Sequence, residues 1–344
     1  MSGDSYRSYN DGASRYRGFA SDDASERRRA ETSRAERVAE SRTRIEEGNI
    51  PEPPKRDTED LYDRRAVRLG IKKPPKSAKR LHVALVDNSG SNRKIAEHTR
   101  ASSGYLLSTL GIIDGVSALA LNYFSDHCDG DRLMQGVDWV LPNEAGDRQL
   151  LSSMRHIEQA SGGDEAEAIE CALAQACELD FGGLPKEARH LYLITDVVAH
   201  GMGLRDDRGC PEQCNWRKSL EKVRETYASF EVIGSGDDSS TARLQAQFLT
   251  PERLPYDLID LSEVPETEHR MRITTNALLL LIARRNGLQS VQTFLMALYE
   301  KWLAEPIFGA NTDLSAREAI RRFLKYLEID EAARRAFEKK IFAE

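Results

Sequence analysis

The sequence predicts an α/β fold with a doubly wound, mostly parallel β-sheet, a helical C-terminal extension and a disordered N-terminal tail. Between residues 81 and 261, short apolar runs alternate with segments of helical length, which is the order of elements in βαβ folds. The runs are continuously apolar, as in parallel strands that are covered on both faces. Residues 1–20 are rich in Ser, Tyr, Arg, Gly and Asp and have no apolar period, a composition that cannot bury a core.

Three regions follow from composition. We expect a disordered, low-complexity region over 1–76, an α/β domain over 77–265 and a helical extension over 266–344. The boundary before the domain is marked by prolines typical of extended linkers, namely Pro51, Pro53, Pro54, Pro74 and Pro75.

The charge of the chain divides at about the same boundary. Residues 1–80 carry 20 Lys and Arg against 15 Asp and Glu, whereas residues 81–344 carry 29 against 41. A basic tail on an acidic body permits weak contact of the tail with nucleic acid, but the acidic body argues against general nucleic-acid binding.

The expected elements can be placed along the chain. We expect strands at about 81–87, 116–124, 136–141, 189–195, 230–234 and 256–261. The helices between them are expected at about 94–112, 147–160, 164–179, 214–228 and 241–249, with a marginal polar helix over 22–47. In the C-terminal region we expect a helix with its core at 277–283, a helical stripe over 294–302 and one final amphipathic helix with apolar residues from Ile320 to Phe342. These last helices should pack on one another and on the α/β domain, and a partner-binding face is the alternative.

The first apolar run ends in a group of oxygen-bearing side chains. Asp87 follows the run directly, and Ser89 and Ser91 come at the next alternate positions. The carboxyl end of a strand is where an open α/β sheet builds its ligand site. Because few charges and several oxygens suit a hard ion that keeps its waters, this pattern favours Mg²⁺ or Mn²⁺. The alternative is that these side chains only cap loops and satisfy backbone amides.

The D-x-S-x-S pattern resembles the metal-ion-dependent adhesion site of von Willebrand factor A (VWA) domains. Three further segments, at 123–131, 161–169 and 193–201, follow strands or open a helix in the order of the VWA ligand loops. They are most similar to the VWA subgroup associated with alpha-kinases, with its "Y-x-D-x-x-D", "G-G-D-x-x-E" and "T-D-x-x-x-H-G" stretches; the first segment of this chain reads Y-x-x-D-x-x-D. The resemblance covers residues 80–262.

The resemblance implies a set of metal ligands. Asp87, Ser89 and Ser91 match the first loop, and Asp196 matches the aspartate of the third. The second loop has no threonine and offers Asp164 instead, as a ligand or through a water. Asp126 is expected to act behind the ligands by orienting them.

The same resemblance implies a function. VWA domains inside cells serve as interaction modules in multiprotein complexes, with AAA+ ATPases among their partners. We therefore expect a cytoplasmic adaptor or scaffold, not an enzyme, that binds a partner protein through a carboxylate at the metal, through the C-terminal helices, or both. Neither a G-x-x-x-x-G-K-[ST] phosphate loop nor a G-x-S-x-G elbow occurs. The rival is a metal-dependent, phosphatase-like hydrolase with Asp87 as nucleophile, which would need a second acid where Ser89 stands.

Five cysteines, an odd number, favour a reducing cytoplasm over a disulfide framework. We expect Cys210 and Cys214 to be free thiols in a polar loop. A zinc site is the alternative, because His200 lies ten residues upstream, but it would need His127 and Cys128 from another loop. We expect core positions for two histidines in strand patterns, His82 and His190. No apolar run is long enough for a membrane span, and the N-terminus has no apolar stretch of a signal peptide.

Overall fold

The computed structural model describes most of the chain from residue 73 onward. The described residues are 73–163, 166–202, 204, 207, 209–236, 243–244, 247–248, 256–260, 267–304, 312–325, 327 and 329–342. The expected disordered tail up to residue 72, its polar helix over 22–47 and most of the helix expected at 241–249 lie outside these residues.

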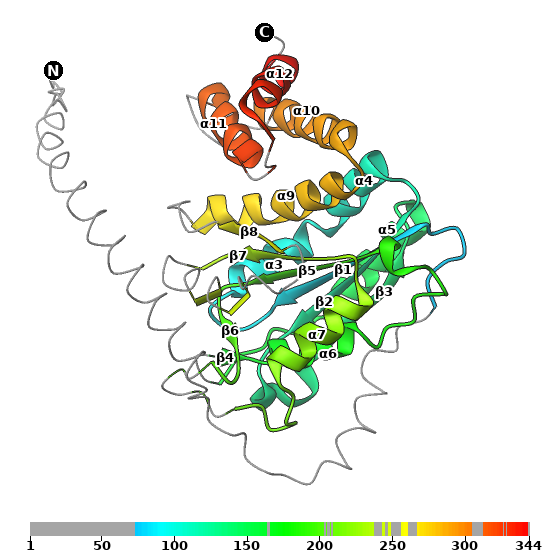
Figure 1. The fold of residues 1–344 in the computed structure, drawn as a ribbon, viewed down its shortest axis with the longest axis vertical. Helices are drawn as coiled ribbons and strands as arrows, with labels where there is room; N and C mark the ends of the chain where they lie inside the picture. The colour runs from blue at the N-terminus through cyan, green and yellow to red at the C-terminus, as the bar shows by residue number, and fades with distance from the viewer. Residues whose placement is uncertain are drawn as a thin grey trace, which may run out of the picture.

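A six-stranded sheet in the order β3-β2-β1-β5-β7-β8 forms the centre of the molecule (Figure 1). The first strand, β1, lies in the middle of the sheet. Strands β2 and β3 extend the sheet to one edge, and β5, β7 and β8 then build the other half. The predicted doubly wound architecture is therefore confirmed. All neighbouring strands are parallel except β3, which runs antiparallel to β2 at the edge. The strands are β1 (Arg80–Asp87), β2 (Ser117–Phe124), β3 (Met134–Val140), β5 (Arg189–Thr195), β7 (Ser229–Gly234) and β8 (Tyr256–Asp260).

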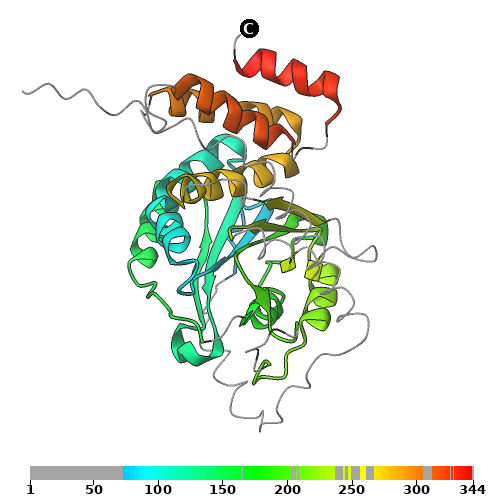
Figure 2. The same cartoon turned by 90° about the vertical axis from the view of Figure 1, so that its left-hand side faces the viewer.

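Helices cover both faces of this sheet (Figures 1 and 2). One face carries α6 (Ile169–Ala176) and α7 (Trp216–Thr226), and their apolar residues share a core with Leu81, Val83 and Leu85 of β1. The opposite face packs against α3 (Arg93–Ala101), α4 (Ser103–Ile113), α5 (Glu144–Met154) and α9 (Thr267–Arg285). Because β1 is buried on both sides, its continuous apolar run is explained.

Some expected helices have different limits. The helix expected over 94–112 is broken at Ser102, where two serines and a glycine weaken the helix. Helix α5 begins earlier than expected because the Asn143 side chain caps it by accepting from the Gly146 amide across 2.9 Å.

The helix expected over 164–179 is shorter, α6 (Ile169–Ala176), and the first residues of that range form a short strand, β4 (Ala166–Glu167). It pairs with β6 (Val198–Ala199) as a second, two-stranded parallel sheet that was not expected. Two short 3₁₀ segments, η1 (His127–Arg132) and η2 (Lys186–Ala188), complete the connections.

The C-terminal helices pack on the sheet domain through α9, as expected (Figure 2). The apolar run Ala277–Ala283 of α9 is buried on all sides, between the sheet and the outer helices. The single final helix that was expected is two, because Asp330 starts a new helix by accepting from the Ala333 amide across 2.7 Å. The outer helices are α10 (Leu288–Ala304), α11 (Thr312–Lys325) and α12 (Glu331–Ile341).

Two strand histidines occupy the core, as expected. His82 contacts the hydroxyls of Tyr192 and Ser117, both across 3.1 Å, and His190 contacts the Ser229 hydroxyl across 3.0 Å. Burial lowers the pKa of His82 well below its ordinary value and, together with the charges of two arginines, lowers the pKa of His190 to about 4. Both imidazoles are therefore neutral at physiological pH.

Of the helices in the described ranges, none has both the length and the apolar character that a membrane crossing requires.

Candidate functional site

Four of the five predicted metal ligands lie together at the carboxyl end of β1 and β5. The Ser91 hydroxyl donates to Oδ1 of Asp196 across 3.2 Å, and its oxygen lies 3.2 Å from Oγ of Ser89. The Ser89 amide donates to Oδ1 of Asp87 across 2.8 Å. These strands are adjacent and parallel, with Val86 beside Ile194, so residues that end them meet at one edge. The fifth residue, Asp164, lies outside the described residues.

The four side chains differ in their exposure to solvent. Asp87 and Ser89 are buried, Asp196 is half-buried and Ser91 is exposed. An ion held by these oxygens would have acids beneath it and solvent above it. Whether they bind a metal stays a prediction.

Acidic side chains accumulate at this edge. Burial raises the pKa of Asp87, although hydrogen bonds from Ser89 and Thr195 oppose the rise. Burial and the charge of Asp87 raise the pKa of Asp196 to about 7. Buried acids this close together favour either protonation or a cation.

Glu167 belongs to the same acidic cluster and was not among the predicted ligands. It lies in β4 and is 3% exposed, and burial followed by the charge of Asp87 raises its pKa to about 10. Its Oε2 atom is buried and has no hydrogen-bond partner within the described part of the chain. An unsatisfied carboxylate oxygen beside Asp87 fits a site built for a cation. The signal in the sequence was the final Glu of the "G-G-D-x-x-E" stretch.

Thr195 is a second residue that sequence reasoning missed. Its hydroxyl donates to Oδ2 of Asp87 across 2.9 Å, while Oδ1 of that carboxylate accepts from Ser89. Both oxygens of Asp87 are therefore oriented by neighbours, as is usual behind a ligand.

A glycine-containing loop, residues 161–163, closes one side of the cluster. The Asp129 carboxylate accepts from the amides of Ser161 and Gly162, both across 3.0 Å. Gly162 has φ of +74°, and a Cβ atom there would lie 2.6 Å from Oε1 of Glu167 and 3.6 Å from Cβ of Ser89. Only glycine permits this conformation and this close approach.

Asp126, expected behind the ligands, forms its closest contacts away from them. Its Oδ1 accepts from the His127 amide across 2.6 Å and lies 3.3 Å from Nε2 of His200. These hydrogen bonds lower its pKa although burial opposes ionisation. Its link to the acidic cluster is electrostatic, because its charge helps to raise the pKa of Glu167.

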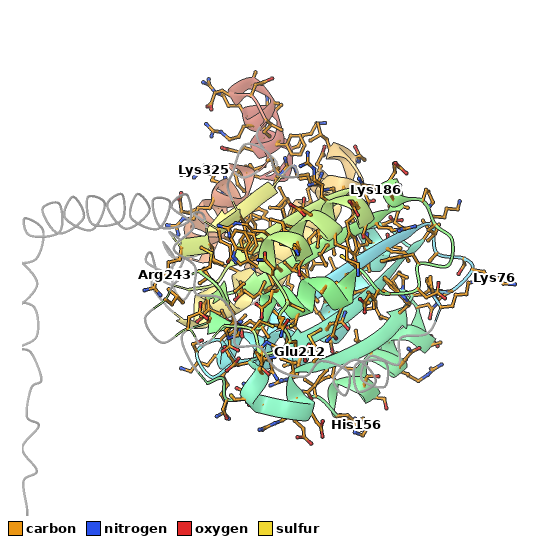
Figure 3. All side chains as sticks on the ribbon, turned by 60° about the horizontal axis from the view of Figure 1, so that its bottom comes forward. Lys76, His156, Lys186, Glu212, Arg243 and Lys325 are labelled. Atoms are coloured by element: carbon orange, nitrogen blue, oxygen red, sulfur yellow. The ribbon has the colours of Figure 1, made fainter. Side chains whose placement is uncertain are left out.

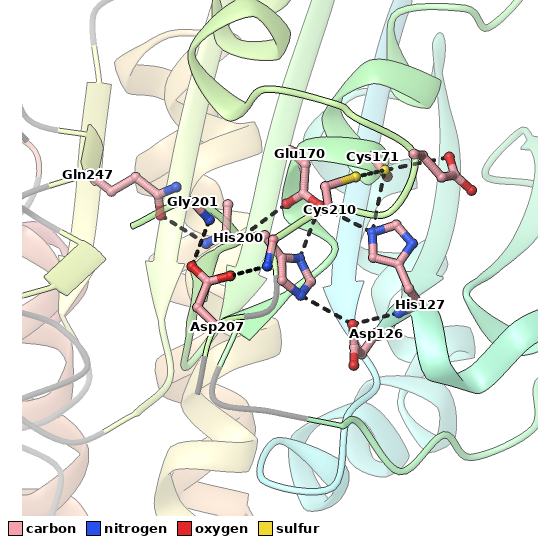
Figure 4. Close-up of polar contacts among 12 residues, drawn as sticks. Asp126, His127, Glu170, Cys171, His200, Gly201, Asp207, Cys210 and Gln247 are labelled. Carbon is pink, nitrogen blue, oxygen red and sulfur yellow. Dashed lines mark hydrogen bonds and ion pairs between the residues drawn. The ribbon is translucent and has the colours of Figure 1, made fainter. Parts of the chain in front are cut away.

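His200 is held between two carboxylates (Figure 4). Besides contacting Asp126, its Nδ1 lies 3.1 Å from Oε1 of Glu170, and its amide donates to Oε2 of the same residue across 3.2 Å. Burial opposes a charge on this ring, but hydrogen bonds to Asp126 and Glu170 raise its pKa to about 11. His200 is therefore a buried imidazolium in a carboxylate cage.

Three cysteines gather next to this cage. Sγ of Cys171 lies 3.5 Å from Sγ of Cys210 and within 4.8 Å of Sγ of Cys214, and none of the three forms a disulfide. Nε2 of His127 lies 3.8 Å from Cys171 Sγ. Neither Cys210 nor Cys214 forms a disulfide, as expected, but Cys210 is not in polar surroundings, because it is buried against Cys171 of α6. Figure 3 shows Glu212, from the same loop, far from Lys76 at the amino end of the sheet.

Comparison with known proteins gives structural neighbours only. No family model matches the sequence, and a search of curated proteins finds no match. The chain is similar to the pilus adhesin SpaC from Lactobacillus rhamnosus GG in its open conformation, with 15% identity and a TM-score of 0.40 over 61% of this chain and 31% of that one. It is also similar to a von Willebrand factor type A structure from Catenulispora acidiphila, with 16% identity and a TM-score of 0.37 over 58% and 43%. The third neighbour is the SpRpn10 VWA domain, with 12% identity and a TM-score of 0.35 over 57% of this chain and 95% of that one.

Two of these three structures are VWA domains by name. The chain spans about a third of the SpaC chain. Similarity at this level transfers no residue's role, so the site rests on the geometry described above. Membership of the alpha-kinase-associated subgroup stays a prediction.

Proposed function

We propose that this protein is an intracellular, metal-dependent protein-interaction module of the VWA type. Mg²⁺ or Mn²⁺ would be held by Asp87, Ser89, Ser91 and Asp196, with Asp164 as a further oxygen donor. The ion would complete its coordination with a carboxylate from a partner protein. The single observation that carries this proposal is the convergence of two hydroxyls with the buried Asp87 and the half-buried Asp196 at the sheet edge.

The chemistry of the donors supports a hard divalent ion. All are carboxylate or hydroxyl oxygens, which Mg²⁺ and Mn²⁺ prefer. The unsatisfied oxygen of Glu167 supports a cation as well, directly or through a water. The exposure of Ser91 leaves the solvent side of the cluster open to a partner.

The rival, a phosphatase-like hydrolase, has less support. Asp87 is 0% exposed, and both of its carboxylate oxygens accept hydrogen bonds, whereas a nucleophile must reach its substrate. Ser89 stands where the general acid would be needed.

The test compares the capture of a partner protein in the presence and in the absence of the metal. Tagged full-length protein is used to capture partners from a lysate of its source cells in Mg²⁺ and in EDTA, with Ser89→Ala as the site variant. Ser108→Ala is the matched control, because among the described residues this exposed hydroxyl of α4 donates to the Tyr105 carbonyl within its own helix and to no side chain of the site. We expect EDTA and Ser89→Ala to remove the same partner, while Ser108→Ala retains it and all forms stay folded.

A partner that binds equally well in EDTA would move the interface away from the metal. The outer helices α10 to α12 would then be the leading surface, and an AAA+ ATPase would remain a candidate partner. Phosphate release from a generic phosphoester that depends on Mg²⁺ and on Asp87 would favour the rival.

A further inference from the structure

We propose that Cys171, Cys210, Cys214 and His127 form a zinc site, separate from the oxygen cluster at Asp87. Three thiolates and one imidazole are a typical ligand set of structural Zn²⁺. Soft sulfur ligands select against Mg²⁺ and Mn²⁺, so the two sites would hold different metals.

Two of the observed distances are close to the edges of a zinc tetrahedron. With Zn–S of about 2.3 Å and Zn–N of about 2.0 Å, ligand atoms lie about 3.8 Å apart for two sulfurs and about 3.5 Å apart for sulfur and nitrogen. The structure has 3.5 Å between Sγ of Cys171 and Cys210, and 3.8 Å between Cys171 Sγ and Nε2 of His127. Sγ of Cys214 lies within 4.8 Å of Cys171. Cys214 is not in the group of ligand atoms that contains His127 and Cys210, so its side chain would turn toward them to close the site.

The four residues come from three separate segments of the chain. His127 opens η1 after β2, Cys171 lies in the first turn of α6, and Cys210 and Cys214 share the loop before α7. One ion would therefore link a 3₁₀ segment, a helix and a loop that are separate in the sequence, and structural zinc ions stabilise folds by such links.

The loop between Cys210 and Cys214 contains a residue in an unusual backbone conformation. The Gln213 amide donates to the Cys210 carbonyl across 3.0 Å, and Gln213 has φ of +55°. No other non-glycine residue in the described ranges has a positive φ. The Asp207 carboxylate ties this loop to the end of β6 by accepting from the amides of Gly209 and Gly201, across 2.8 Å and 2.7 Å. Such strain is kept where a function requires the geometry.

The groups around the thiols suit a metal better than a purely apolar core. Glu170 Oε1 lies 3.3 Å from Nε2 of His127, and Glu212 Oε2 lies 3.7 Å from Sγ of Cys171. Buried thiols pack as small apolar groups, but apolar packing does not explain an imidazole and two carboxylates aimed at them. Glu170 is engaged by His200, so we assign it to the surroundings of the site, and zinc bound at Nε2 of His127 would replace the contact of that nitrogen with Glu170 (Figure 4).

The test measures zinc in the purified full-length protein under reducing conditions. We expect about one zinc per chain by elemental mass spectrometry, and we expect it to remain in Asp87→Asn. Cys210→Ser and Cys214→Ser should each reduce the bound zinc by tenfold or more. Cys177→Ser and Cys128→Ser are the matched controls and should retain it, because neither cysteine belongs to the cluster.

Two further measurements keep the proposal testable if a serine variant does not fold. Co²⁺ titrated into the metal-free wild type should give the visible bands of tetrahedral thiolate coordination. His127→Cys should retain the metal, because a fourth thiolate completes a Cys₄ site.

Three outcomes would overturn the proposal. The first is folded, reduced wild-type protein that neither carries zinc nor binds added Zn²⁺ or Co²⁺. The second is equal loss of zinc in Cys177→Ser and Cys214→Ser. The third is a native protein in which intact mass shows Cys171 and Cys210 joined as a disulfide, with two hydrogens lost.

Discussion

His200 donates from Nε2 to Oδ1 of Asp126 across 3.3 Å. This contact lies between the two candidate metal sites. Asp126 precedes His127 of the thiol cluster, and a Cβ atom on Gly163 would lie 2.4 Å from its Oδ2. The loop that closes the oxygen cluster and the loop that carries a zinc ligand are therefore both built against one buried ion pair.

His200→Gln should lower the free energy of unfolding by about 3 kcal/mol, because it leaves the carboxylates of Asp126 and Glu170 buried without their counter-charge. Urea denaturation at pH 7 measures this loss. A change below about 1 kcal/mol, within the range of exposed ion pairs, would mean that His200 carries no buried charge.

Asp87→Asn should abolish stabilisation by Mg²⁺ or Mn²⁺ while the metal-free domain stays folded. The substitution keeps the shape of the side chain and removes a buried carboxylate whose pKa is already raised by burial. If the wild type is measured at 100 times its dissociation constant, the metal should stabilise it by about 2.7 kcal/mol. Thermal unfolding with and without metal checks this, and an equal shift in both proteins would place the ion elsewhere.

Gly162→Ala should destabilise the domain and weaken metal binding. A Cβ atom at a positive φ costs about 1–2 kcal/mol by itself, and here it would also meet Glu167 at 2.6 Å. Gly183→Ala is the matched control, because its φ is +81° but nothing lies within 4 Å of the new Cβ. We expect a greater loss of stability for Gly162→Ala, and reduced Mn²⁺ affinity by calorimetry only in that variant. Equal effects of the two substitutions would show that Glu167 is not held by this contact.

The buried His190 should make the protein sensitive to mild acid. Its pKa is about 4 in the folded state against an ordinary value of 6.5. Between these two pH values the imidazole binds a proton in the unfolded chain but not in the folded protein. The contribution of the neutral ring is intact above pH 6.5 and falls by up to about 3 kcal/mol as the pH drops to 4. His190→Gln cannot titrate, so its stability should fall less over the same range. Parallel curves of unfolding free energy against pH for the two proteins would contradict this account.

A fragment that ends at residue 265 should not fold stably. It lacks α9, whose buried run Ala277–Ala283 covers one face of the sheet, and the exposed face would favour aggregation. A fragment over 73–344 should unfold cooperatively. Circular dichroism and size-exclusion chromatography of both fragments test this, and a monomeric, cooperatively folded 77–265 fragment would make the C-terminal helices an independent unit.

The sequence by itself determined the class of fold and the first loop of the site. Buried parallel strands leave an unbroken apolar run, and the run over β1 ends at Asp87, so the order of strands and helices and the position of Asp87, Ser89 and Ser91 could be read along the chain. The same local logic identified His82 and His190 as core residues.

Only the tertiary structure decided which distant residues meet. The two-residue strands β4 and β6 are too short to leave a periodic signal, yet β4 holds Glu167 in the acidic cluster. Cys171 reads in the sequence as one small residue of a helix, and 39 positions separate it from Cys210. Their contact depends on how α6 and the loop before α7 pack against each other, which is set by the summed packing of the core and not by any local pattern.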